Sequence, residues 1–216
     1  MEINVKNNSD LKEFQNRIGY HFNDEKYLKT ALTHSSFANE VKMRKVNDNE
    51  RLEFLGDAVL ELTSSDYIYK NHSEMNEGSM TRLRASIVCE PTLALCAKDI
   101  NLSEYIMLGK GEEQTGGRKR ASIISDAFEA LIGSIYLDGG FASSKEFILK
   151  FVTTDLDDKQ LFYDSKTILQ EVVQAEGKEV EYDLISEKGP EHDKVFEVTA
   201  SASGMFEVGG KGHTKK

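Results

Sequence analysis

The spacing of apolar residues changes partway along the chain, and this change limits the fold more than any other feature of the sequence. Up to about residue 153, apolar residues recur every three or four positions, as in Leu52–Ile68 and Ile123–Leu137, which predicts helices. Further on, Glu181–Leu184, Val195–Ala200 and Phe206–Val208 alternate apolar and polar residues, which predicts strands. We therefore expect a mainly α domain followed by a small α+β domain.

The boundary between the two patterns lies in a short polar segment. Its residues, Asp155–Gln160, have the composition of a linker. We predict a first domain over residues 1–154, a linker over 155–162 and a second domain over 163–216. The second domain begins with a predicted helix, Thr167–Ala175, and glycine-bearing turns separate its strands. A chain of 216 residues is long enough for two domains of modest size.

Composition excludes several classes of protein. No apolar stretch approaches the roughly 20 residues needed to span a bilayer, and the N-terminus lacks the apolar core of a secretory signal. Two cysteines, Cys89 and Cys96, cannot form a disulfide framework or a four-ligand zinc site. These features predict a cytoplasmic protein that does not enter a membrane.

The chain carries a net charge of −10, from 27 basic and 37 acidic residues. Taken alone, this balance argues against a nucleic-acid partner, because phosphate binding usually leaves a basic surface. A total charge nevertheless hides local patches. It also hides acidic clusters that bind metal ions, because the positive charge of a bound ion is not included in a net charge calculated from the sequence.

Acidic residues share one face of the predicted helix near residue 50. At about 100° per residue, Glu50, Glu53 and Asp57 point the same way, and Glu61 falls near this stripe. Such a stripe is usually an ordinary solvated face. Here, however, the like charges repel without a lysine at the next turn to offset them. Gly56 is also unfavourable inside a helix, and it is explained if another backbone approaches closely. The opposite side carries Leu52, Leu55, Val59 and Leu62.

A second acidic pair, Asp126 and Glu129, lies on a largely apolar helix. Two carboxylates there are costly to bury unless they are paired or bind a metal. If the two acidic helices pack together, their carboxylates form one cluster whose oxygen ligands suit Mg²⁺. The alternative is a salt bridge to Arg82 or Arg84, and spacing alone does not choose between them.

Four segments together resemble the ribonuclease III family. They are NERLEFLGDAVLEL at 49–62, DAFEALIGSIYLDGG at 126–140, NEGSMTRLRA at 76–85 and LGKGEE at 108–113. Their order and separation match the family over nearly the whole chain. The resemblance implies an Mg²⁺-dependent endonuclease that cuts double-stranded RNA to 5′-phosphate and 3′-hydroxyl ends, in rRNA and mRNA processing. The alternative is a protein that binds double-stranded RNA without cutting it.

The resemblance also implies roles for single residues. Glu53, Asp57, Asp126 and Glu129 match the family's metal-binding catalytic carboxylates, for Mg²⁺ with Mn²⁺ as a substitute, and no small-molecule cofactor is expected. All four are present, which argues against an inactive member. Glu50 and Glu77 match accessory acidic positions. Phe54 matches a residue that inserts into the partner subunit of a homodimer; the alternative is an ordinary core phenylalanine. His34 lies in a family-like segment, and we interpret it as a structural histidine.

The second domain resembles the double-stranded RNA-binding domain. The positions that match the family's RNA contacts are Thr167, Gln170, Glu171, His192, Lys211, Lys215 and Lys216. In the family, a second helix follows the three strands. Because this sequence stops at Lys216, we expect that helix to be missing and the domain to be incomplete at its C-terminal end.

Overall fold

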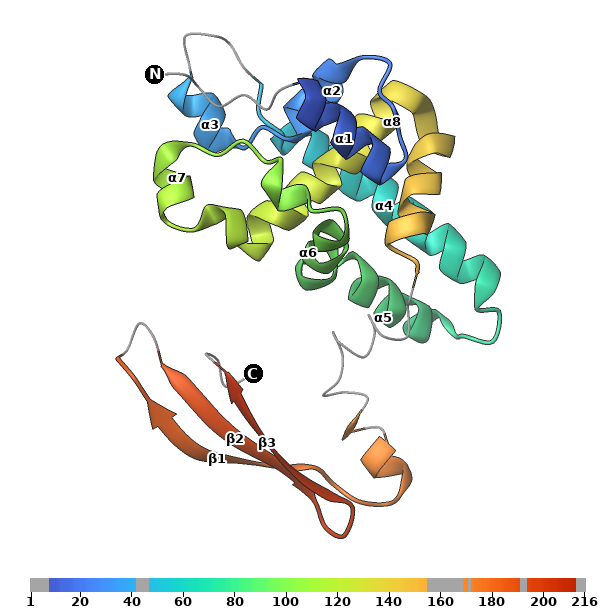
Figure 1. The fold of residues 1–216 in the computed structure, drawn as a ribbon. Helices are drawn as coiled ribbons and strands as arrows, with labels where there is room; N and C mark the ends of the chain where they lie inside the picture. Colours follow the sequence, from blue (N-terminus) through green and yellow to red (C-terminus); the bar gives the residue numbers. More distant parts are fainter. Residues whose placement is uncertain (1–7, 42–46, 155–168, 171, 191–193, 213–216) are drawn as a thin grey trace. The chain divides into compact units, whose positions relative to one another are not determined.

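The computed structural model describes residues 8–41, 47–154, 169–170, 172–190 and 194–212. The chain divides into two compact units, Met1–Tyr163 and Asp164–Lys216. The predicted linker lies outside the described residues, and the predicted boundaries at 154 and 163 stay predictions. Figure 1 shows a helical first unit and a second unit built on a sheet.

The helices of the first unit follow one another through short connections. They are α1 (Asn8–Ile18), α2 (Glu25–Ala31), α3 (Ser35–Glu40), α4 (Glu50–Asn71), α5 (Glu77–Val88), α6 (Glu90–Asp99), η2 (Leu102–Glu104), α7 (Lys110–Gln114), η3 (Gly117–Lys119) and α8 (Ala121–Phe151). Helices α4 and α8 contain the predicted helical stretches Leu52–Ile68 and Ile123–Leu137, and they pack together along much of their length (Figure 1).

The core of this unit forms where α2 and α6 pack against α8 and α5 packs against α4, and apolar residues of α1 join it. Leu60 and Ile68 of α4 and Phe128 and Ile132 of α8 are almost fully buried. Burial of such side chains is the main favourable term in folding. None of the described helices is long and apolar enough to cross a membrane.

Helix α8 bends at Gly140, whose φ of 77° lies in the left-handed region. Just before the bend, Asp138 accepts hydrogen bonds from the Tyr20 hydroxyl (2.7 Å) and from the backbone N–H groups of Asn23 and Asp24 (2.8 Å each). One carboxylate therefore fastens the bend of α8 to the connection between α1 and α2.

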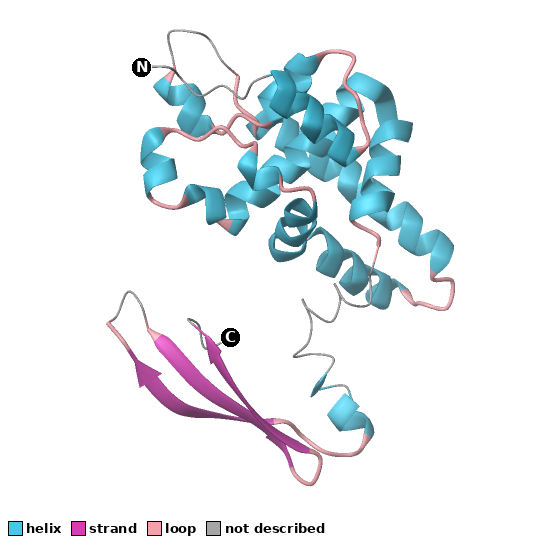
Figure 2. Ribbon diagram, in the orientation of Figure 1, coloured by secondary structure: helices cyan, strands magenta, loops and turns pink. Residues whose placement is uncertain are grey.

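The second unit contains one antiparallel sheet in the order β1-β2-β3 (Figure 2). Its strands are β1 (Glu181–Lys188), β2 (Val195–Ala202) and β3 (Phe206–Gly212). Tyr182 pairs with Ala200, which in turn pairs with Val208, so apolar side chains from all three strands share a face. Residues 169–170 and 172–175 are helical, and Val173 is fully buried.

The predicted fold class, a helical domain followed by a small α+β domain, is confirmed. All three strands are longer than predicted, β2 by two residues and β1 and β3 by four each. In β1 the register shifts between Leu184 and Ser186, and this irregularity interrupts the alternation beyond Leu184. In β3, pairing continues through Gly209–Gly212, where glycines provide no apolar pattern. The place where we expected a missing second helix, residues 213–216, lies outside the described residues.

Candidate active site

The backbones of α4 and α8 touch at two glycines. A Cβ atom on Gly56 would overlap the carbonyl oxygen of Glu129 and lie 2.9 Å from the nitrogen of Gly133. A Cβ on Gly133 would overlap the carbonyl oxygen of Leu52. The expectation that another backbone approaches Gly56 is therefore confirmed. The contact brings the acidic segment of α4 next to the acidic segment of α8.

The carboxylates at this crossing influence one another. Burial raises the pKa of Glu129 to about 8, and the charges of Asp57, Glu53 and Asp126 add to the shift. Burial also raises the pKa of Glu53, with contributions from Asp126, Glu50 and Asp57. Like charges raise carboxylate pKa values only at short range. The four predicted metal-binding carboxylates therefore lie in one electrostatic cluster, with Glu50 beside it.

Asp126 has further neighbours. Burial raises its pKa and Glu90 raises it further, whereas a hydrogen bond with Ser125 and the charge of His34 lower it. Glu90 begins α6, and His34 precedes α3. Asp126 therefore lies where α6 and the start of α3 come near the two acidic helices.

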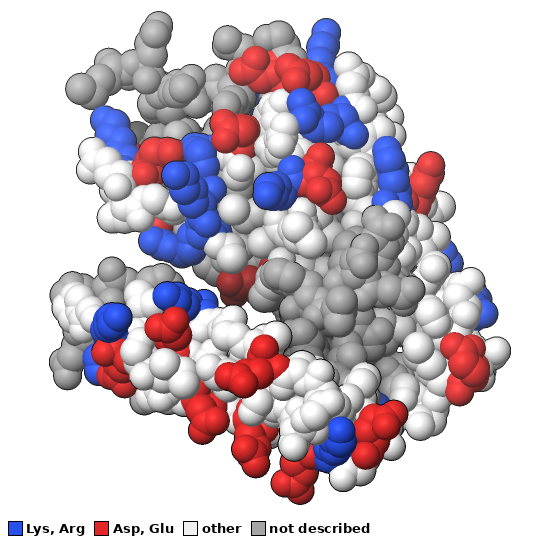
Figure 3. Space-filling view, turned by 60° about the horizontal axis from the view of Figure 1, so that its bottom comes forward, with Lys and Arg blue, Asp and Glu red and all other residues white. Residues whose placement is uncertain are grey.

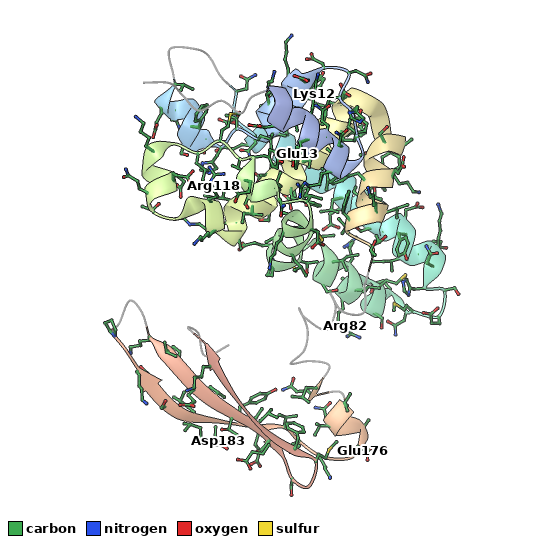
Figure 4. The ribbon with its side chains drawn as sticks, in the orientation of Figure 1. Lys12, Glu13, Arg82, Arg118, Glu176 and Asp183 are labelled. Carbon is green, nitrogen blue, oxygen red and sulfur yellow. The ribbon has the colours of Figure 1, made fainter. Side chains whose placement is uncertain are left out.

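The salt-bridge alternative does not describe the acidic pair on α8. Arg84 forms an ion pair with Glu61 on α4 (Nε to Oε2, 2.9 Å) and donates to the Ser65 hydroxyl (3.0 Å). Arg82 projects outward from α5 (Figure 4) and its described contact is with Ser79. Within the described residues, no ion pair joins either arginine to Asp126 or Glu129.

The cluster fits a hard divalent cation by donor type and by charge. Its ligating atoms would all be carboxylate oxygens, which Mg²⁺ prefers, and burial together with mutual repulsion raises the pKa values of Glu53 and Glu129. In the part of the chain that the structure describes, no three acidic, histidine or cysteine side chains are already grouped closely enough to hold a metal. Among the described residues, the two helices thus bring the carboxylates near one another without a closed set of metal ligands.

The two accessory acidic residues have different surroundings. Glu50 is the exposed first residue of α4 and its charge reaches Glu53. Glu77 is the exposed first residue of α5, and its carboxylate accepts a hydrogen bond from the Thr81 hydroxyl (3.0 Å). Glu77 also lines a pocket of about 540 Å³ between α4 and α5, whereas Glu50 stands at the carboxylate cluster.

Phe54 is 80% exposed, so the interpretation as a core phenylalanine is wrong. Of the apolar residues predicted on the other side of α4, Leu52 and Val59 are buried and Leu55 is half-buried, but Leu62 is 59% exposed. Tyr69, in the last turn of the helix, is 74% exposed. One face of α4 therefore carries large apolar side chains that the described residues do not cover.

Most of the predicted RNA contacts lie outside the described residues, namely Thr167, Glu171, His192, Lys215 and Lys216. Gln170 is helical and half-buried. Lys211 is exposed on β3 and pairs with Glu197 (3.2 Å). Figure 3 shows acidic side chains spread over the sheet unit with few basic ones among them. Asp183, labelled in Figure 4, belongs to that sheet.

Sequence reasoning missed Gly133 at the crossing and the influence of Glu90 and His34 on Asp126. Gly133 lies four residues after Glu129, and this helical spacing could have indicated it. Glu90 gave no such signal, because only tertiary structure brings α6 to Asp126. His34 lay in a recognised segment, but nothing in its spacing indicated that it is near Asp126.

Comparisons with known proteins agree with this arrangement. A family model described as "Ribonuclease-III-like" matches residues 24–156, and one described as "Double-stranded RNA binding motif" matches residues 165–216. Proteins named "Ribonuclease 3" are similar over most of the chain. The Bacillus velezensis protein is 47% identical over 209 residues, which cover 95% of this chain and 84% of that protein. The Listeria monocytogenes serotype 4a protein is 45% identical over 208 residues, covering 95% and 91%.

Solved structures include the nuclease domain of ribonuclease III from Campylobacter jejuni, described in terms of structural flexibility in a region involved in dimer formation. It matches with a TM-score of 0.62 and 39% identity, over 67% of this chain and 97% of that one. A helical unit with paired acidic helices, followed by a double-stranded RNA-binding motif, defines the class of nucleases that act on RNA duplexes. This chain belongs to the ribonuclease III family.

Proposed function

We propose that the protein is an Mg²⁺-dependent endonuclease that hydrolyses double-stranded RNA and leaves 5′-phosphate and 3′-hydroxyl ends. The observation that carries this proposal is the carboxylate cluster at the crossing of α4 and α8, in a chain whose other unit matches a double-stranded RNA-binding motif. A cluster of carboxylates repels the RNA backbone, so RNA binding alone does not account for it.

In this proposal, Glu53 and Asp57 from α4 and Asp126 and Glu129 from α8 hold the cation, and Mn²⁺ can replace Mg²⁺. Bound Mg²⁺ would acidify a water molecule and stabilise the charge that develops on the leaving oxygen. Asp57 is exposed, so it marks the side of the cluster that the RNA backbone can reach.

The remaining assignments belong to the same proposal. Glu50 and Glu77 act as accessory acidic groups near the cleavage site. The second unit holds the duplex through Thr167, Gln170, Glu171 and His192, together with the lysines at 211, 215 and 216. The enzyme acts as a homodimer on rRNA and mRNA precursors in the cytoplasm.

The deciding experiment is incubation with a long RNA duplex in Mg²⁺, in Mn²⁺ and in EDTA. We expect shortening of the duplex in both metals and none in EDTA, and end analysis should find 5′-phosphates and 3′-hydroxyls. An intact duplex that nevertheless shifts in a binding gel would favour binding without cleavage. Products with 2′,3′-cyclic phosphates would refute hydrolysis by water, because they require attack by the ribose 2′-hydroxyl.

A further inference from the structure

Glu61 continues the acidic face of α4 beyond the residues assigned to the metal site. It lies one helical turn after Asp57, and at about 100° per residue the two side chains leave the helix within about 40° of each other. Helix geometry therefore makes Glu61 a fifth carboxylate next to the proposed site, although it has no role in that site.

The directions of the two acidic helices place Glu61 on the side where α8 carries its own carboxylates. Gly133 of α8 touches Leu52 of α4. Glu129, one turn earlier on α8, touches Gly56, one turn later on α4. The helices thus run in opposite directions where they touch, and the next turn of α4, with Glu61, lies toward the part of α8 that precedes Glu129.

Arg84 of α5 holds the Glu61 side chain through a two-point contact with α4. The Nε atom of Arg84 pairs with Oε2 of Glu61 (2.9 Å), and its Nη1 donates to the hydroxyl oxygen of Ser65 (3.0 Å). That hydroxyl donates in turn to the backbone carbonyl of Glu61 (2.7 Å), so its oxygen is free to accept from the arginine. A planar guanidinium fixed at two points has little freedom to turn, and the Glu61 carboxylate is therefore committed to α5.

We infer that Arg84 is a positioning residue that keeps the Glu61 carboxylate out of the proposed metal site and so limits that site to four carboxylates. The consequence is a preference among cations. Mg²⁺ requires octahedral coordination and usually keeps several waters, whereas Ca²⁺ takes more oxygen ligands in a flexible geometry. A fifth carboxylate would favour Ca²⁺ and would displace water, which hydrolysis consumes. This inference rests on the proposed function, since it concerns the same metal site.

Four variants separate this role from a structural one. Arg84→Met removes the charge and the donors but keeps a long flexible side chain. Both members of the ion pair are 39% exposed, so its loss costs the fold little. Arg84→Lys keeps a positive charge that can pair with Glu61. Arg84→Met combined with Glu61→Gln restores the wild-type net charge and leaves no carboxylate to release. Arg82→Met changes the net charge as Arg84→Met does, but Arg82 projects outward from α5 (Figure 4) and contacts Ser79, so it is the matched control.

The main measurement is Ca²⁺ binding to the RNA-free protein by calorimetry. We expect Arg84→Met to tighten Ca²⁺ binding on the order of tenfold, because the number of charged ligands sets the affinity of such sites. Ca²⁺ should then inhibit cleavage in Mg²⁺ at a correspondingly lower concentration. The double variant should return to wild-type Ca²⁺ affinity, and Arg84→Lys and Arg82→Met should keep it. Arg84→Gln, which also lacks the charge, should act in the same direction as Arg84→Met and replaces it if the methionine variant does not fold.

The inference is overturned if loss of the arginine charge leaves Ca²⁺ affinity unchanged, or if Glu61→Gln does not reverse the gain. A raised KM for duplex RNA at wild-type Ca²⁺ affinity would also overturn it, and would make Arg84 an RNA contact instead. Glu129→Gln, tested in parallel, separates these results from failure of the proposed function. Where wild type cuts and Glu129→Gln does not, an unchanged Ca²⁺ affinity of Arg84→Met refutes only the role of Arg84. Where wild type does not cut in Mg²⁺, the proposed function and the inference fall together.

Discussion

At the scale of single residues, Glu129 shows most directly what the carboxylate cluster requires. Its pKa is raised to about 8, first by burial and then by Asp57, Glu53 and Asp126. Burial and the neighbouring negative charges both disfavour the ionised form of this carboxylate. A divalent ion bound by oxygen ligands would offset the repulsion and favour the ionised form.

Glu129→Gln should separate chemistry from binding. The amide keeps the shape of the side chain but lacks the charge that a cation needs, so we expect cleavage to fall by more than about 100-fold, beyond the usual range for groups that only orient ligands. Duplex binding, measured in EDTA, should be unchanged, because the RNA-binding motif lies in the other unit. Wild-type cleavage rates at limiting Mg²⁺ would show that Glu129 is not a ligand.

Helical spacing explains why part of this site could be predicted. Glu53 and Asp57, and likewise Asp126 and Glu129, repeat at intervals that place them on one face, and this holds before any packing is known. His34 and Glu90 could not be found in this way, because their positions near Asp126 depend on α3 and α6 packing against other helices. Their closeness to Asp126 depends on the tertiary structure and not on the local sequence.

At the scale of helices and strands, the contact between Gly56 and Gly133 determines how near the acidic segments come. The unfavourable glycine inside α4 was a usable signal, since its cost in a helix implies a compensating contact.

The extent of β3 could not be predicted from the sequence. Gly209 and Gly210 have no side chains to form an alternating pattern, and they are held in the strand by pairing with β2.

Gly56→Ala tests the helix contact. Alanine alone would favour the helix by about 1 kcal/mol, but its Cβ would overlap the carbonyl oxygen of Glu129, and a backbone cannot rotate away as a side chain can. We expect net destabilisation of about 1–3 kcal/mol, visible in urea unfolding, together with reduced cleavage. Gly111→Ala in α7, where a Cβ would meet nothing within 4 Å, is the control and should be at least as stable as wild type, because only the gain in helix propensity remains. Equal stability of the two variants would contradict the close contact.

Asp138 provides a pH test of the α8 bend. Although burial alone would raise the pKa of Asp138, hydrogen bonds from the N–H groups of Asp24 and Asn23 and from Tyr20 lower it. Its stabilising effect is therefore fully present above the unfolded pKa of about 3.9 and is lost as pH falls through the lower folded value. Asp138→Asn should cost about 1–2 kcal/mol at pH 7, and the difference from wild type should shrink below pH 4. A cost that does not change between pH 7 and pH 3 would refute the role of the charge.

At the scale of the whole molecule, total charge was a poor guide to the partner. The net charge of −10 argued against nucleic acid, yet the chain carries a double-stranded RNA-binding motif. Some of the acidic excess belongs to the carboxylate cluster and some to the exposed strand residues of the sheet unit, such as Glu181 and Asp183. Neither location can be inferred from the net charge, because a net charge does not say where in the structure the acidic residues lie.

The exposed apolar face of α4 explains why a second subunit is expected. Phe54, Leu62 and Tyr69 are spaced so that they fall within about 80° of one another around the helix, and all three are more than half exposed. Large apolar side chains gathered on one face usually mark an interaction surface. A two-fold symmetric dimer would cover this face with its own copy and would provide two cleavage sites for the two strands of a duplex.

Phe54→Ala should therefore weaken the homodimer, which sedimentation at micromolar concentration can measure, while leaving the Tm of the nuclease unit nearly unchanged. Leu95→Ala removes a large apolar side chain that is also exposed but lies on α6, and it should not alter the dimer. Mixing wild-type subunits with Glu129→Gln subunits tests the dimer independently. The mixed dimers should nick one strand of the duplex, because only one of their two sites is active. If monomeric wild-type protein cuts both strands together, or if mixed samples yield no nicked duplex, the dimer is not the unit that cleaves.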